Sequence, residues 1–186
     1  MLDWMKAGDW ARILEEYDAD RDYHEPLLVW VRPSLPMLKF LEYQLRNLGY
    51  DTIFSIGCGC AFLEWLLSQA TALKVEGLEV NSGWWESEYS TPHFIPLTYT
   101  EPGTIPRLDP GKPLLFCYFN NLEFFHEYLE AYDGDCVVLI GPIDGEKHCD
   151  PEPGYLEKNL GHVWRLQAVH DIRDEGTDLI AIYVRR

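Results

Sequence analysis

The stretch that decides the fold is Thr52-Ile-Phe-Ser-Ile56, which runs directly into Gly57-Cys-Gly-Cys-Ala61. The first five residues form a short apolar run, which is typical of a strand buried in a sheet. The glycines after it let the backbone turn sharply and let a ligand lie against the main chain. We expect a helix over residues 62–72, and the first turn of a helix carries free N–H groups. The pattern therefore predicts a strand, a glycine loop and a helix.

Outward from this unit, apolar runs alternate with amphipathic segments along most of the chain. Leucines at a spacing of three and four predict a helix over residues 33–48, with Ser34 as its N-cap. Pro96 places the third strand at a sheet edge, because proline removes a ladder hydrogen bond. The remaining predicted elements are strands 74–80, 94–99, 114–119 and 136–140, helices 9–17, 122–132 and 153–160, and a terminal hairpin of strands 163–172 and 179–184 joined by a turn over 173–177.

This order of elements predicts an α/β protein with three layers. Strands that alternate with helices form a mostly parallel sheet covered on both faces, and the terminal hairpin adds antiparallel strands to give seven in all. A length of 186 residues fits one domain with a sizeable core. We expect residues 33–186 to form that domain and residues 1–32, which are acidic and aromatic, to form an arm or lid.

Composition and charge narrow the class of partner. Hydrophobic residues make up 47% of the chain and charged residues 25%, the balance of a soluble globular protein. There are 31 acidic and 15 basic residues, and the net charge of −16 repels phosphate backbones. The charge therefore disfavours nucleic acid as a partner, unless a local basic patch or a basic partner subunit binds it. A small molecule, a basic protein or simple solubility fits this surface better.

The cysteines and the apolar runs indicate the compartment. The chain has five cysteines, an odd number, and no paired CxxC spacing that supports a zinc site. No apolar run approaches the roughly 20 residues of a membrane helix, and the first residues do not resemble a secretory signal. We expect a cytoplasmic protein in a reducing environment, with no metal and no membrane contact.

The glycine loop fits neither of two common nucleotide motifs. A dinucleotide fingerprint requires a third glycine at position 62, which is Phe62, and the only Gly-Lys pair, Gly111-Lys112, precedes proline instead of serine or threonine. A second marker is Glu79, which ends the predicted strand 74–80 twenty residues after Gly59. An acidic side chain there can accept hydrogen bonds from both hydroxyls of a ribose.

The loop and the spaced acid together resemble motif I and the ribose acid of class I S-adenosylmethionine (SAM)-dependent methyltransferases. The resemblance spans about residues 33–186 and implies their Rossmann-like fold and SAM as cofactor. It implies that the loop binds the cofactor and that the end of the next strand holds the ribose. The residues concerned are Ser55, Gly57, Cys58, Gly59 and Cys60 in and before the loop, and Glu79 and Val80 at the strand end.

Two residues depart from the family pattern. Ser55 stands where the family usually has an acid that helps to position the amino-acid end of the cofactor, and Ala61 replaces the third glycine. Either the cofactor is held differently or its affinity is reduced. Arg32, just before the first long helix, is a candidate partner for the cofactor carboxylate.

The end of the fourth strand is where the family places acceptor-side residues. Here the sequence is Tyr118-Phe119-Asn120, and we assign Asn120 and Tyr118 as catalytic candidates and Phe119 to the cofactor site. The alternative for Asn120 is that it caps the following helix. Tyr99 and Glu101, after the third strand, are the candidates for contact with the adenine ring.

Two functions remain open from the sequence. The first is an active methyltransferase that acts on a small molecule or a protein, in which catalysis is mainly alignment of acceptor and methyl group. The second is a catalytically silent methyltransferase-like binding or scaffold subunit, which the departures at Ser55 and Ala61 favour and whose acidic surface suits a basic partner. A nucleotide-binding oxidoreductase is a third and weaker interpretation, which Phe62 disfavours.

Overall fold

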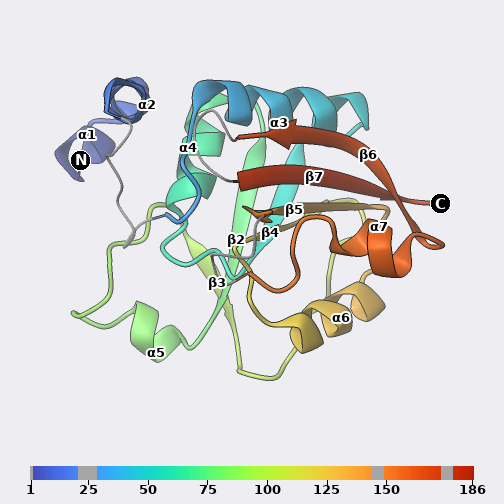
Figure 1. Cartoon of the computed structure of the whole chain (residues 1–186). Helices are drawn as coiled ribbons and strands as arrows, with labels where there is room; N and C mark the ends of the chain where they lie inside the picture. Colours follow the sequence, from blue (N-terminus) through green and yellow to red (C-terminus); the bar gives the residue numbers. More distant parts are fainter. Residues whose placement is uncertain (1, 21–28, 144–148, 173–177) are drawn as a thin grey trace.

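The structure, a computed structural model, describes residues 2–20, 29–143, 149–172 and 178–186. Its centre is one seven-stranded sheet with the order β3-β2-β1-β4-β5-β7-β6 (Figure 1). The strands β3, β2, β1, β4 and β5 are parallel to their neighbours, and β7 is antiparallel to both β5 and β6. The strands are β1 (Thr52–Ile56), β2 (Lys74–Val80), β3 (Leu97–Thr100), β4 (Leu114–Cys117), β5 (Cys136–Pro142), β6 (Trp164–Asp171) and β7 (Asp178–Arg185). The predicted parallel sheet with an antiparallel C-terminal pair is confirmed.

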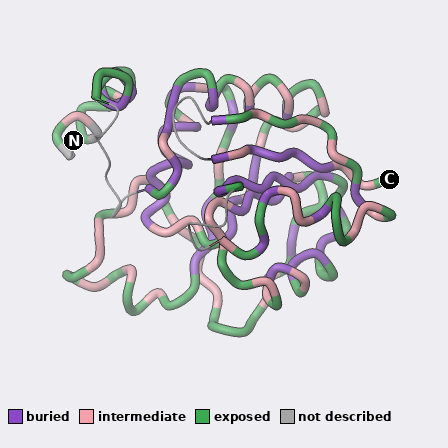
Figure 2. Tube along the Cα trace, in the orientation of Figure 1, coloured by how far each residue is buried: buried purple, intermediate pink, exposed green. Residues whose placement is uncertain are grey.

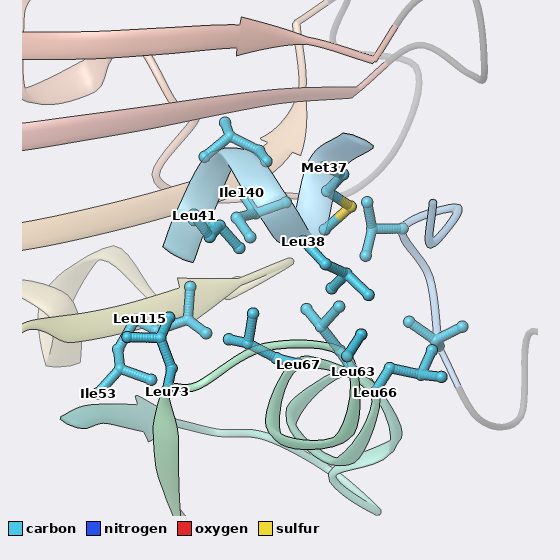
Figure 3. Packing of buried hydrophobic residues seen from close by; sticks show 14 of the residues in the cluster. Met37, Leu38, Leu41, Ile53, Leu63, Leu66, Leu67, Leu73, Leu115 and Ile140 are labelled. Atoms are coloured by element: carbon cyan, nitrogen blue, oxygen red, sulfur yellow. The ribbon is translucent and has the colours of Figure 1, made fainter. Parts of the chain in front are cut away.

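Helices cover both faces of this sheet. The described helices are α1 (Leu2–Lys6), α2 (Trp10–Ala19), α3 (Leu35–Asn47), α4 (Phe62–Ala70), α5 (Ser82–Trp85), α6 (Leu122–Ala131) and α7 (Tyr155–Leu160). Of these, α3 and α4 cover one face of the sheet and α6 and α7 cover the other. Side chains of α3 and α4 share one buried cluster with Ile53, Leu115 and Ile140 of the sheet (Figure 3). Side chains of α2 belong to the same cluster. Side chains of α6 and α7 share a second cluster with Phe116 and Leu139. Because neighbouring strand residues point to opposite faces, the apolar strands supply both cores, and Figure 2 shows these strands as mostly buried.

Several element ends differ from the prediction for local reasons. The third strand was predicted over 94–99 but begins at Leu97, because Phe94 packs its ring on Phe62, with ring centroids 4.9 Å apart. The fourth was predicted to reach residue 119 but ends at Cys117, because Tyr118 has a φ of 51°. The predicted helix over 62–72 ends at Ala70, since Thr71 is extended.

Other differences concern segments near the ends of the chain. Helix α1 was not predicted, and α2 runs to Ala19, beyond the predicted residue 17. Helix α7 begins at Tyr155, two residues later than predicted. The predicted turn over 173–177 lies outside the described residues, although the two strands that it joins are paired.

The predicted cap and edge are confirmed. The Ser34 hydroxyl accepts a hydrogen bond from the Met37 N–H at 3.3 Å and begins α3, with Pro36 in the first turn. Strand β3 lies at the sheet edge beside Pro96. Helix α2 packs on α4 through Ile13, Leu14 and Tyr17, which are buried in the same cluster as α4.

No helix in the described ranges is long and apolar enough to span a membrane.

Candidate functional site

The glycine loop and the segment after β4 meet at the carboxyl ends of the parallel strands. In open α/β sheets ligands bind at this edge, at the point where the connections from two adjacent parallel strands lead to opposite sides. Here that point is at β1, which lies between β2 and β4. Gly57, Gly59 and Ala61 have φ values of 67°, 61° and 60°. Ala61 therefore adopts the left-handed backbone conformation that glycine usually adopts. The loop therefore has a positive φ at every second residue from 57 to 61, although the last of these residues is an alanine.

Gly57 lies directly against Phe119. A Cβ atom at Gly57 would lie 3.3 Å from two ring carbons of Phe119. The same glycine lines two pockets, one on each side of the loop. A side chain at position 57 would therefore stand at the wall that the two pockets share.

Gly57→Ala is expected to lower the free energy of unfolding by about 2 kcal/mol, from left-handed strain of roughly 1–2 kcal/mol and from the contact with Phe119. Gly49→Ala is the matched control, because Gly49 also has a positive φ, 90°, but has open space around its Cβ position. Urea denaturation measures both variants. Equal losses in the two variants would contradict the close approach to Phe119.

The first pocket, here called the apolar pocket, has a volume of about 270 Å³. It lies between the ends of β1 and β2 on one side and the segment after β4 on the other. Its lining is mainly apolar and includes one carboxylate, that of Glu79. The residues are Ile56, Gly57, Leu78, Glu79, Val80, Pro102, Gly103, Phe119, Asn121, Phe124 and Tyr128.

The Glu79 carboxylate is largely buried, with 9% of the residue exposed. It accepts hydrogen bonds from the N–H groups of Gly59 at 2.6 Å and of Val80 at 3.0 Å. The Trp85 side chain also hydrogen bonds to it. Burial raises the pKa of Glu79 in spite of these bonds. A buried carboxylate at the wall of an apolar pocket is suited to accept hydrogen bonds from neutral hydroxyl groups.

The second pocket, here called the carboxylate pocket, has a volume of about 220 Å³ and lies on the other side of Gly57. It combines aromatic rings, thiols and one buried carboxylate. The residues are Val29, Trp30, Gly57, Cys58, Gly59, Cys60, Leu63, Glu64, Trp85, Cys117 and Tyr118. Val29 and Trp30, which lie within the segment predicted as an arm or lid, thus line this pocket.

Glu64 is the residue that sequence reasoning missed. It lies in the first turn of α4 with 2% of its surface exposed, and its Oε1 accepts a hydrogen bond from the Ser55 hydroxyl at 2.6 Å. Burial raises the pKa of Glu64 to about 7, and the bond from Ser55 opposes that rise. The available signal was a single acid inside the otherwise apolar run Phe62-Leu-Glu-Trp-Leu-Leu67.

The ring of Tyr118 lines the carboxylate pocket and its hydroxyl points elsewhere. The Trp30 and Tyr118 ring centroids are 5.9 Å apart. The Tyr118 hydroxyl donates a hydrogen bond to the buried Asp178 at the start of β7. Burial and this bond raise the pKa of Tyr118 well above its usual range. At neutral pH this hydroxyl therefore stays protonated. A catalytic role for Tyr118 stays a prediction.

The alternative role of Asn120 as the cap of α6 is wrong, because Asn121 is the cap. The Oδ1 atom of Asn121 accepts the Phe124 N–H at 3.1 Å, whereas Asn120 is exposed and its backbone bridges to Asp150. One position decides the cap because only the residue just before the first helical turn reaches its free N–H groups. Contact of Asn120 with an acceptor stays a prediction.

Tyr99 and Glu101 lie beside the two pockets in a separate hollow with Asn81, Ser82 and Thr104. Pro102 lines both this hollow and the apolar pocket. The Tyr99 hydroxyl lies 3.4 Å from Nδ1 of His93. Contact of Tyr99 and Glu101 with adenine therefore stays a prediction. It requires a ligand that extends from the apolar pocket past Pro102 into this hollow.

The loop thiols and Arg32 are held by other groups. Cys58 Sγ lies 3.7 Å from the Leu78 carbonyl, and burial raises its pKa above the range of a reactive thiol. Burial raises the pKa of Cys60 to about 11. The Arg32 guanidinium donates to the Asp20 carbonyl at 2.8 Å, and its pairing with a cofactor carboxylate stays a prediction.

Comparison with known proteins identifies the fold through solved structures. No family model matches the chain, and no curated protein matches it. Among solved structures, magnesium protoporphyrin IX methyltransferase from Synechocystis PCC 6803 with bound SAM is 14% identical, with a TM-score of 0.51 over 82% of this chain and 79% of that one. The methyltransferase domain of bacterial CtHen1 is 12% identical, with a TM-score of 0.51 over 81% and 100%.

A third similar structure is an O-methyltransferase from neocarzinostatin biosynthesis, solved with SAM and 2-hydroxy-5-methyl naphthoic acid. It is 10% identical, with a TM-score of 0.52 over 81% of this chain and 57% of that one. The acceptors named for such proteins differ, while the architecture is shared. The chain therefore has the fold of class I SAM-dependent methyltransferases.

Proposed function

We propose that this protein binds SAM and transfers its methyl group to a small-molecule or protein acceptor. The observation that carries the proposal is the pair of pockets that meet at Gly57, one of them walled by the buried carboxylate of Glu79. The methyltransferase fold of the chain supports it. Methyltransferases of similar fold were solved with SAM in place.

The residues at the site fit the chemical parts of SAM. The apolar pocket suits an adenosine group, with Phe119 and Tyr128 as aromatic walls and Glu79 as the acceptor for ribose hydroxyls. The carboxylate pocket suits the charged amino-acid end, because it holds a buried acid and aromatic rings. When bound, SAM supplies an electrophilic methyl group on a sulfonium.

The contribution of the chain itself is alignment and exclusion of water. The rings of Trp30, Trp85 and Tyr118 line the carboxylate pocket, and such aromatic walls suit a planar or cationic acceptor held next to the methyl group. The protonated Tyr118 hydroxyl is held by Asp178 and takes no proton from the acceptor. An acceptor whose nucleophile needs no deprotonation before methyl transfer fits this wall best. The net charge of −16 favours a small molecule or a basic protein over nucleic acid.

A thermal-shift measurement tests the proposal. SAM or S-adenosylhomocysteine (SAH) at one hundred times its Kd is expected to stabilise the protein by about 2.7 kcal/mol, which raises the Tm by roughly 5–10 °C for a domain of this size. NAD⁺ at the same concentration is the control and is expected to give no comparable shift, because Phe62 stands at the third glycine of the dinucleotide motif. No shift with millimolar SAM and SAH would contradict the proposal.

A further inference from the structure

Ser55 and Glu64 form a buried pair beneath the glycine loop. Ser55, on β1, has no exposed surface, and Glu64, nine residues later on α4, is 2% exposed. The 2.6 Å bond from the Ser55 hydroxyl places the carboxylate beside the end of β1. A carboxyl group therefore lies next to this strand end, although the strand itself carries only a serine there.

The pair lacks a cationic partner within the described part of the chain. No described Lys or Arg forms an ion pair with Glu64. The titratable groups that face it are another carboxylate, Glu79 on β2, and the thiols of Cys58, Cys60 and Cys117. A buried acid among such neighbours is unfavourable when ionised. Because Glu64 also lines the carboxylate pocket, a cation in that pocket would relieve this penalty.

We propose that Glu64 binds the α-ammonium of the cofactor's amino-acid end and so replaces the acid that β1 lacks at Ser55. This inference rests on the proposed function. With adenosine in the apolar pocket, the amino-acid end of the same molecule passes over Gly57 into the carboxylate pocket. There Glu64 provides the negative charge, and Ser55 orients its carboxylate. Glu64 is thus a specificity residue for ligands that carry the amino-acid end.

Two ligands separate this role from a general effect on the site. SAH has the amino-acid end, whereas 5′-methylthioadenosine has the same nucleoside and a thioether without it. Glu64→Gln keeps the size of the side chain and an oxygen that can accept from Ser55. It is expected to weaken SAH binding by about ten- to a hundredfold, the range for loss of a charged hydrogen bond, and to leave methylthioadenosine binding within about twofold. Isothermal titration calorimetry measures both.

Two further variants complete the experiment. Ser55→Asp in the Glu64→Gln background returns an acid to the strand end and is expected to restore at least part of the SAH affinity. Glu130→Gln, at an exposed position on α6, is the control and is expected to change neither affinity. Unchanged SAH binding by Glu64→Gln, or an equal loss for both ligands, would overturn the role of Glu64. Failure of the unsubstituted protein to bind either ligand would instead contradict the proposed function.

Discussion

Glu79→Ala is expected to weaken SAH binding by at least about a hundredfold. In the proposed complex the Glu79 carboxylate accepts two hydrogen bonds from ribose hydroxyls, and a hydrogen bond to a charged group contributes about 1.5–3 kcal/mol. The substitution also releases the N–H groups of Gly59 and Val80, which Glu79 now holds. The loss therefore combines direct contacts with a loop that is no longer held in place.

Calorimetric titration with SAH measures this effect. Glu76→Ala is the matched control, because Glu76 lies on the same strand, is exposed, and pairs with Lys112 on the surface. It is expected to bind SAH as the unsubstituted protein does. A Glu79→Ala variant that keeps its fold by circular dichroism and also keeps its SAH affinity would contradict the ribose role of Glu79.

Glu64→Gln is expected to change how the stability of the ligand-free protein depends on pH. The pKa of Glu64 is about 7 in the folded protein and near its ordinary value of 4.5 in the unfolded chain. Between these values the folded state holds the extra proton, so stability falls as the pH rises through this window and stays reduced above pH 7. At 1.36 kcal/mol per pKa unit, the penalty between pH 5 and pH 8 is about 2–3 kcal/mol.

The measurement is urea denaturation of both proteins at pH 5 and pH 8 without ligand. The free energy of unfolding of the unsubstituted protein, relative to that of Glu64→Gln, is expected to fall by about 2–3 kcal/mol between the two pH values. The comparison cancels the contributions of all other titrating groups and of the amide itself. A constant difference would show that Glu64 is ionised at ordinary pH and has no buried penalty to relieve.

The two measurements on Glu64→Gln, of stability and of SAH binding, separate an effect on binding from an effect on folding. Glu64→Gln is expected to make the free protein relatively more stable at pH 8 while it weakens SAH binding. A variant that simply misfolds would lose both. The opposite signs follow from one cause, because the buried charge that penalises the empty site is the charge that pairs with the ligand.

The sequence predicted the fold well wherever the pattern was local and repetitive. The bounds of β1 and β2 were predicted to the residue because each is a compact strand pattern ended by a loop signal. Ser34 was identified as the cap of α3 because a serine before an amphipathic run has a local function. The third and fourth strands were predicted too long, because the side-chain packing of Phe94 and the positive φ of Tyr118 are not visible in an apolar run.

The site was less predictable because its contacts join distant parts of the chain. Gly57, Glu79 and Phe119 were identified from motif and spacing, and the structure places all three around one pocket. Glu64 was missed, because an acid in the first turn of a helix ordinarily faces solvent. Asp178 was missed as well: it lies 60 residues from Tyr118, and only the position of β7 beside β5 brings the two side chains together.

A crystal structure of the protein with SAH tests the central claim most directly. The account predicts adenosine in the apolar pocket, with both ribose hydroxyls on Glu79, and the amino-acid end in the carboxylate pocket within hydrogen-bond distance of Glu64. The chain of the ligand is expected to cross Gly57. Absence of SAH from both pockets at millimolar concentration, or SAH bound only in the hollow between Asn81 and Thr104, would contradict the account.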